Sequence, residues 1–279
     1  AVDFYSGTQP INFYSRPTGI LNDTDTKLLL DFEGADSSQV FDDLSDSNHT
    51  VNAWNSVQID TAQAIFGSSS CFFSGNILIN GGTEDALYIA NSADFTFGSN
   101  DFSVGTAVRF PTLPTNAQEY VIAGVGRFTG ATNQNCWRIE LDGSVSGTPP
   151  TQVISVFISY NGDTSPDIVM SYTWSGVTID TWYYIRLARN GATLRLFIWE
   201  NISGIWTGGE VKNANIGANS IHPSTKGLII GSLPDEDNED LPSNESTDGW
   251  FYGWMDGFQI LSTYRDTPPS IPINFYSLP

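Results

Sequence analysis

Glu140 and Asp142 are the acidic residues whose spacing comes closest to that of a catalytic pair. Glu140 lies in the predicted strand Trp137–Leu141 and Asp142 directly follows it, so in an extended chain both side chains point to the same face. Two carboxylates on one face are what a glycosidase uses, one as the acid/base and one as the nucleophile. Gly143 and Ser144 come next and indicate a turn.

The other residues with reactive side chains show no catalytic spacing. His49 and His222 are far apart, and each stands among turn residues, which is typical of surface histidines. Neither a Gly-x-Ser-x-Gly motif nor a phosphate-binding loop occurs. Cys71 and Cys136 lack metal-ligand spacing, and either one disulfide or two buried thiols fits a domain of this size. We therefore predict that no residue of the chain is catalytic.

Other residues are compatible with sugar or cation binding. Lectin-like sites combine aromatic platforms with Asn and Asp on loops. Four tryptophans are candidates, although packing in the core or against an arm explains each of them better: Trp174, Trp206, Trp250 and Trp254. The stretch Asp235–Asp248 holds seven carboxylates, which we interpret as a solvated surface loop, with calcium capture as the alternative.

The charge of the chain excludes two classes of partner. Its 279 residues include 11 Lys or Arg and 31 Asp or Glu, for a formal net charge of −20. Such a surface repels the phosphates of nucleic acid and of anionic lipid. No apolar run approaches the roughly 20 residues that span a bilayer. We therefore predict neither nucleic-acid binding nor membrane insertion.

A short repeat occurs at both ends of the sequence. Pro10–Pro17 returns as Pro272–Pro279 with seven of eight positions identical, and Asp3–Ser6 is a partial third copy. The flanking prolines favour extended geometry, so we predict arms outside the domain. The arms are either joints of a tandem array, docking segments for neighbouring subunits, or an aromatic edge strand. Their candidate contact residues are Phe4, Tyr5, Phe13, Tyr14, Phe275 and Tyr276.

Strand patterns dominate from Lys27 onward and imply an all-β fold. Short apolar runs separated by Gly, Pro, Asn and Asp recur, and no 3.6-residue period persists over eight or more residues. Many short strands without helices indicate a sandwich or jelly roll. The predicted strands outside the hairpin described next are Lys27–Phe32, Cys71–Ser74, Leu87–Ala90, Asp101–Phe110, Tyr120–Val125, Trp137–Leu141, Val153–Tyr160, Ile168–Trp174, Leu228–Gly231 and Trp250–Ser262.

The clearest pattern is the stretch Trp182–Glu200. Apolar residues alternate on both sides of Asn190-Gly191, which predicts a β-hairpin with a type I′ turn at that pair. One face of each strand must be buried against other strands. The other face is aromatic and either packs on the second sheet or forms a concave surface for a partner: Trp182, Tyr184, Phe197 and Trp199.

Five stretches occur in a characteristic order: Leu28–Ser45, Phe66–Gly75, Ala93–Val104, the hairpin with Trp182 and Leu194, and Leu228–Gly231 followed by Phe251–Ile260. Together they resemble the laminin-G-like branch of the concanavalin A-like lectin/glucanase superfamily. The resemblance covers roughly residues 26–263, which leaves 1–25 and 264–279 as terminal arms.

The resemblance implies a jelly roll of two antiparallel sheets and a role in adhesion or assembly. Some relatives hold a structural calcium near the first and last strands, which here points to Asp31 or Glu33 and Asp256, although Gly257 replaces the usual second acidic residue. Retaining glucanases of the superfamily carry Glu-x-Asp-x-x-Glu, and the sixth position here is Val145. We therefore expect that the chain is not an enzyme.

These observations lead to one hypothesis and one alternative. The hypothesis is a non-enzymatic structural or adhesion module of a repetitive surface assembly, with a phage virion, on its capsid surface or fibre, as the first choice. The arms then make the contacts between subunits. The alternative is a carbohydrate-binding module of a secreted or cell-surface protein, assisted by calcium and directed at surface glycans. Both place the protein on a virion surface or outside a cell.

Overall fold

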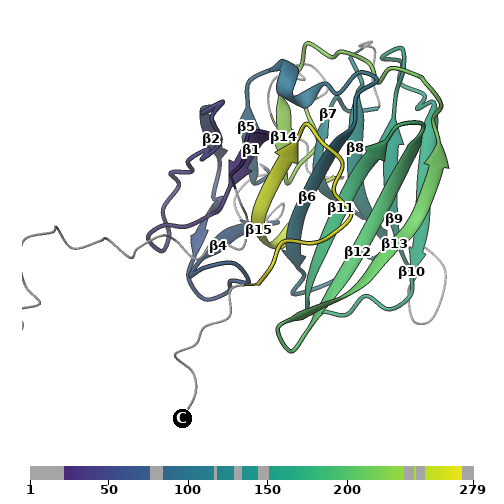
Figure 1. Ribbon diagram of the computed structural model, residues 1–279. Helices are drawn as coiled ribbons and strands as arrows, with labels where there is room; N and C mark the ends of the chain where they lie inside the picture. Colours follow the sequence, from purple (N-terminus) through teal and green to yellow (C-terminus); the bar gives the residue numbers. More distant parts are fainter. Residues whose placement is uncertain are drawn as a thin grey trace, which may run out of the picture.

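The chain folds into two antiparallel β-sheets that pack face to face (Figure 1). The computed structural model describes residues 22–75, 84–115, 118–128, 134–143, 151–235, 242 and 249–271. Within these ranges the one helical element is the 3₁₀ turn η1 (Ala93–Phe95). The predicted all-β sandwich of jelly-roll type is confirmed. The arm residues Phe4, Tyr5, Phe13, Tyr14, Phe275 and Tyr276 lie outside the described residues.

The larger sheet has eight strands, in the order β13-β12-β11-β6-β15-β4-β3, with β1 also paired to β15. Neighbours that are far apart in sequence, such as β6 and β15, show that the chain crosses repeatedly between layers. The strands are β1 (Thr26–Leu30), β3 (Gln58–Asp60), β4 (Ser70–Ser74), β6 (Phe102–Arg109), β11 (Trp182–Asn190), β12 (Thr193–Ile202), β13 (Ile205–Asn215) and β15 (Tyr252–Leu261).

The smaller sheet has seven strands, in the order β10-β9-β8-β7-β14-β5-β2. Its β7, β8, β9 and β10 form a meander, because each of them pairs with the next along the chain. The strands are β2 (Val51–Trp54), β5 (Ala86–Ile89), β7 (Glu119–Val125), β8 (Trp137–Gly143), β9 (Gln152–Ile158), β10 (Ile168–Trp174) and β14 (Leu228–Ile230).

The hairpin of β11 and β12 forms as predicted, but its turn is of another kind. Asn190 pairs with Thr193, so the two turn residues are Gly191 and Ala192. Gly191 has a φ of 55° and Ala192 is not among the residues with positive φ. Positive φ at the first central residue alone is the pattern of a type II′ turn, which takes glycine there. The predicted type I′ turn centred on Asn190-Gly191 is therefore wrong by one residue.

The main core lies between the sheets and takes one face of every long strand. From the hairpin it receives Tyr183, Ile185 and Leu187, which are all buried. Both cysteines lie in this core as free thiols, so the disulfide alternative is wrong and the buried-thiol alternative is confirmed. Burial raises the pKa of both thiols.

Among the described residues, no helix has the length and apolarity needed to cross a membrane.

Three strands lack a sequence signal strong enough to predict them. β2 and β3 are four and three residues long, too short for a clear period. β13 is eleven residues long, but it lies at the edge of the sheet and leaves most of its side chains at least partly exposed. An edge strand buries few apolar residues, so its sequence need not alternate strictly.

Candidate functional site

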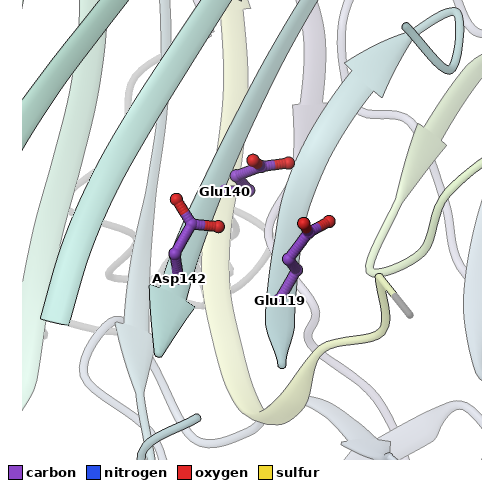
Figure 2. Close-up of side chains that lie close together, drawn as sticks. All are labelled: Glu119, Glu140 and Asp142. Atoms are coloured by element: carbon purple, nitrogen blue, oxygen red, sulfur yellow. The ribbon is translucent and has the colours of Figure 1, made fainter. Parts of the chain in front are cut away.

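Three carboxylates meet on the outward side of β7 and β8 (Figure 2). Glu140 and Asp142 are two residues apart on β8, and Glu119 on β7 stands opposite Asp142 in the strand register. One oxygen from each residue lies within 4.8 Å of the others. The predicted pair therefore does share one face, and the neighbouring strand adds a third acid that the linear motif does not contain.

Arg138 balances part of this negative charge. Its Nε lies 2.7 Å from Oε2 of Glu140, and both side chains are almost fully buried. The guanidinium group also lies over the rings of Phe157 and Phe128, at 4.8 Å and 5.7 Å from their centres. Ser155 donates a hydrogen bond of 3.0 Å to Oδ2 of Asp142. The cluster is thus an internally paired polar network.

Burial sets the protonation of this network. It raises the pKa of Glu140 to about 8, because the opposing effect of Arg138 is smaller and the charges of Asp142 and Glu119 add to the rise. Burial also raises the pKa of Asp142. Near neutral pH, Glu140 therefore keeps its proton and shares it with Asp142. Glu140 is 2% exposed, so a sugar chain has no access to it, and the geometry favours a structural role.

The residues predicted to hold calcium lie close enough to influence one another. Asp31 and Glu33 both raise the pKa of Asp256 through their charge, in addition to the larger effect of its burial. Glu33 is largely occupied by the turn after Gly67: its Oε1 accepts from the backbone N–H of Ser68 at 2.8 Å, and its Oε2 accepts from the Ser68 hydroxyl at 2.6 Å. Glu33 thus holds this turn in place.

Asp256 has one satisfied oxygen and one unsatisfied oxygen. Oδ2 accepts from the backbone N–H groups of Ile65 and Phe66, each at 2.8 Å. Oδ1 is buried and has no hydrogen-bond partner, and the residue as a whole is 0% exposed. A buried carboxylate oxygen in that position needs either a proton or a cation. Calcium at Asp31, Glu33 and Asp256 stays a prediction: carboxylate oxygens suit that ion, but the structure does not bring one oxygen from each of these three residues within 4.8 Å of the others.

The structure separates the four tryptophans predicted for sugar binding. Trp174 is 6% exposed and meets Tyr183 edge-on in the main core. Trp250 is half-buried and packs on Tyr120, with 5.3 Å between ring centres. Trp206 and Trp254 instead lie on the outer face of the eight-stranded sheet, next to its second apolar cluster. Only these two combine an outer-face position with partial exposure.

Trp254 belongs to a row of half-exposed aromatic rings on β4 and β15. The ring of Phe72 lies 5.1 Å from that of Trp254 and 6.3 Å from that of Tyr252. Arg109 stands over the Trp254 ring at 5.1 Å, and the indole N–H donates to Oδ2 of Asp60 at 2.8 Å. Flat apolar rings beside charged hydrogen-bonding groups are what a sugar site requires. We call Phe72, Tyr252, Trp254, Arg109 and Asp60 the β4–β15 platform.

His49 contacts an acidic residue, but the arrangement is not that of a catalytic triad. Its Nε2 lies 3.1 Å from Oδ2 of Asp94, and the Ser47 hydroxyl donates to the same oxygen at 2.9 Å. In a triad the histidine must instead bond the hydroxyl that it activates. Asp94 also lines a hollow of about 100 Å³ with Lys27 and Asp101, which is smaller than typical ligand sites.

Sequence reasoning missed Glu119, Phe72 and Tyr252. Glu119 joins the carboxylate cluster only through the register between β7 and β8, which no linear spacing reveals. Phe72 and Tyr252 could have been found, because Tyr252 is two residues from Trp254 and thus on the same side of a strand. Phe72 follows from the pairing of β4 with β15, where it stands opposite Trp254.

Comparison with known proteins supports the fold. No protein-family model matches the sequence, and no curated protein matches it either. Among solved structures, the binding domain of botulinum neurotoxin serotype C1 is similar over 87% of this chain and 49% of its own, at 16% identity and a TM-score of 0.52. The binding domain of botulinum neurotoxin DC in complex with rat synaptotagmin II gives 15% identity, the same coverage of both chains and a TM-score of 0.53.

A third similar structure is a botulinum neurotoxin type C structure described in terms of cell entry through two ganglioside molecules. It is 14% identical over 87% of this chain and 49% of its own, with a TM-score of 0.51. This chain therefore spans about half the length of the structures that it matches. At such identities the likeness establishes a shared lectin-like β-sandwich fold.

Proposed function

We propose that the chain is a non-enzymatic adhesion module that binds a surface glycan through the β4–β15 platform. The observation that carries this proposal is the platform itself: three half-exposed rings, with a cation over one of them and a carboxylate at its edge. The burial of Glu140 supports a binding role over a hydrolytic one, because the acid closest to a catalytic position is out of reach of a substrate.

The comparisons support the same class of function. Similar structures include the binding domain of botulinum neurotoxin DC in complex with SialylT and a botulinum neurotoxin type C structure described in terms of two ganglioside molecules. Those ligands belong to those proteins, and what this chain shares with them is the fold. The fold presents the outer faces and the loops of two sheets to solvent, and sugar-binding sites commonly occupy such surfaces.

A glycan array probed with the labelled protein tests the proposal. We expect binding to at least one glycan class and a roughly tenfold loss for Trp254→Ala, which corresponds to about 1.4 kcal/mol of stacking. Trp206→Phe is the matched control, because it changes a tryptophan on the same face outside the platform. Equal binding by the wild-type chain and Trp254→Ala, or no binding to any glycan, would refute the assignment.

Calcium at Asp31, Glu33 and Asp256 is a second part of the proposal, supported by the buried and unsatisfied Oδ1 of Asp256. A bound ion stabilises the folded state by about 2.7 kcal/mol at one hundred times its dissociation constant. We expect CaCl₂ to raise the melting temperature relative to EDTA in the wild-type chain and in the surface control Glu210→Gln, but not in Asp256→Asn. An unchanged melting temperature in the wild type would count against the site.

A structural role in a repetitive surface assembly is the second candidate function. The repeat shared by Pro10–Pro17 and Pro272–Pro279 favours it, because identical segments suit identical docking places. Membership of the laminin-G-like branch, placement on a phage virion and a division into arms and a 26–263 domain form part of this proposal. Electron microscopy of the purified chain tests it: ordered fibres or rings are expected, and dispersed particles at high concentration would argue against it.

A further inference from the structure

The hollow of about 100 Å³ beside Asp94 lies next to η1, which stands at one end of the sandwich (Figure 1). Three segments that are far apart in the sequence line it: the start of β1, the turn between η1 and β6, and the end of β15. Thr26 of β1 pairs with Leu261 of β15, and Leu261 pairs in turn with Ser103 of β6. The register of the eight-stranded sheet therefore holds the walls of the hollow together.

Part of the lining is apolar and aromatic. The rings of Phe97 and Phe102 stack there, with 3.8 Å between their centres and 9° between their planes, and both side chains are buried. Trp137 lies behind Phe97 in the core, with 5.7 Å between ring centres. A ligand that fills the hollow therefore gains by turning C–H groups toward these rings.

The rest of the lining is charged or polar, and its charges do not pair with one another. It includes the ammonium group of Lys27 and the carboxylates of Asp94 and Asp101. Lys27 donates to the carbonyl oxygen of Thr24 at 3.3 Å, and in the described part of the chain no ion pair joins it to either carboxylate. Opposite charges that border one hollow without pairing are available to a ligand that contacts both.

Each carboxylate is fixed through one of its two oxygens. Oδ2 of Asp94 accepts from the hydroxyl of Ser47 at 2.9 Å and lies 3.1 Å from Nε2 of His49. Oδ1 of Asp101 accepts from the backbone N–H of Gly191 at 2.6 Å. The second oxygen of each carboxylate is an acceptor that a ligand can use. Because both side chains are already held, ordering them costs little when a ligand binds.

Size and charge restrict the class of ligand. Benzene fills a cavity of about 150 Å³, so this hollow takes a group of roughly four to six non-hydrogen atoms. Two carboxylates and one ammonium group leave a net negative charge, in a chain whose formal net charge is −20, so an anionic ligand is repelled. An organic cation of this size would lie beside the ammonium group of Lys27. A neutral polyol meets neither obstacle, because each hydroxyl both donates and accepts.

We propose that this hollow binds a neutral polyhydroxyl group, which comes from a small free polyol or from the end of a sugar chain. Asp94 and Asp101 accept hydrogen bonds from its hydroxyls, and Lys27 and Asn100 donate to them. The C–H groups of the ligand face the ring of Phe97.

This site is separate from the β4–β15 platform. Phe102 begins β6 and Arg109, which belongs to the platform, ends it. Seven steps of about 3.3 Å put the two residues roughly 23 Å apart. A small polyol cannot touch both places, so the proposal does not rest on the platform.

An NMR titration of the ¹⁵N-labelled full-length chain with glycerol tests the site. We expect a Kd on the order of 10 mM, as suits so small a ligand. The amide signal of Gly191 and the indole signal of Trp137 should shift, because these groups lie directly behind Asp101 and Phe97. The indole signal of Trp254, on the platform, should stay in place.

Further probes define the class and the source of the ligand. 1,2-Dimethoxyethane has as many non-hydrogen atoms as glycerol but no hydroxyl to donate, so it should not bind. Methyl glycosides of glucose, galactose and mannose separate the two sources. If one of them binds at least as tightly as glycerol, the hollow takes the end of a sugar chain, and if glycerol alone binds, it takes a free polyol.

Variants connect the binding to the named side chains. Lys27→Met removes the ammonium group and should weaken glycerol binding about tenfold, the effect of one charged hydrogen bond. Asn100→Ala should weaken it about threefold and serves if Lys27→Met fails to fold. Lys212→Met is the matched control, since it makes the same charge change at an exposed position of β13 and should leave the affinity unchanged.

Trp254→Ala should also leave glycerol binding unchanged, so this site and the platform can fail separately. No shift at ten times the expected Kd, or equal affinity in the wild type and in both hollow variants, overturns the site. Binding of 1,2-dimethoxyethane as tightly as glycerol overturns the role of the carboxylates as acceptors, and binding of glycine in preference to glycerol overturns the neutral class.

Discussion

Replacing Glu140 by Gln should stabilise the protein, and the more so the higher the pH. The pKa of Glu140 rises from 4.5 to about 8 on folding. Between these values the folded chain binds a proton that the unfolded chain has released. The contribution of Glu140 to stability is therefore fully present below pH 4.5 and falls as the pH rises, with the loss complete above pH 8. Gln resembles the protonated acid and can still donate a hydrogen bond to Asp142, but it does not titrate.

The size of the effect follows from the same two values. Each pH unit between 4.5 and 8 costs the wild type about 1.4 kcal/mol of folding free energy, or about 5 kcal/mol over the whole interval. Between pH 6 and pH 9 the cost grows by about 2.7 kcal/mol. In the folded wild type Glu140 is protonated at pH 6. Replacing it by Gln therefore leaves Arg138 in nearly the same surroundings at that pH. The variant should thus gain on the wild type steadily between pH 4.5 and pH 8, by about 1.4 kcal/mol for each unit.

Urea denaturation at pH 6 and pH 9 measures this difference. The comparison of variant with wild type removes the pH effects of all other groups, including the general repulsion of an acidic chain. Glu210→Gln is the control: Asn213 and Arg195 hold the pKa of Glu210 below its ordinary value, so its replacement adds no pH dependence in this range. If Glu140→Gln changes the unfolding free energy equally at both pH values, the buried proton assigned to Glu140 is wrong.

Three further predictions concern the core. Arg189→Lys should lower the unfolding free energy, measured by urea denaturation, by roughly 3 kcal/mol. The guanidinium donates to four main-chain carbonyls, and one ammonium group cannot reach them all. A decrease under 1 kcal/mol contradicts this. Gly231→Ala should lower the stability by about 2 kcal/mol or more, since φ is +90° and the new Cβ would lie 2.3 Å from a Phe73 ring carbon; an unchanged melting temperature would exclude that clash. Cys71 and Cys136 should resist iodoacetamide in the folded chain and react in urea, because both thiols are buried with raised pKa values; labelling of the native protein would disprove it.

The strands that could be predicted from the sequence are those whose buried side chains require a pattern of apolar residues. β10 runs from Ile168 to Trp174, the predicted bounds, and the ends of β6, β11, β12 and β15 differ from prediction by at most one or two residues. β13 was not predicted, because all of its side chains are at least partly exposed and burial therefore imposes no apolar alternation on it, whereas the edge strand β10 has buried residues. The carboxylate cluster was predictable in part: Glu140 and Asp142 share a face by their spacing, whereas Glu119 requires the register.

The aromatic face of the hairpin shows why sequence periodicity predicts that a face is buried but not which segment buries it. The alternation places four aromatic residues on one face of the hairpin: Trp182, Tyr184, Phe197 and Trp199. Rings of that size are rarely left in water, so this face is expected to be buried. Periodicity does not show which segment buries it. Residues 263–271 cover this face with backbone carbonyls, two prolines and the side chains of Tyr264 and Ile271, and four of these nine residues are exposed. The sequence of such a segment looks like that of a linker, because the groups that bind the sheet are mainly backbone groups, which every residue has.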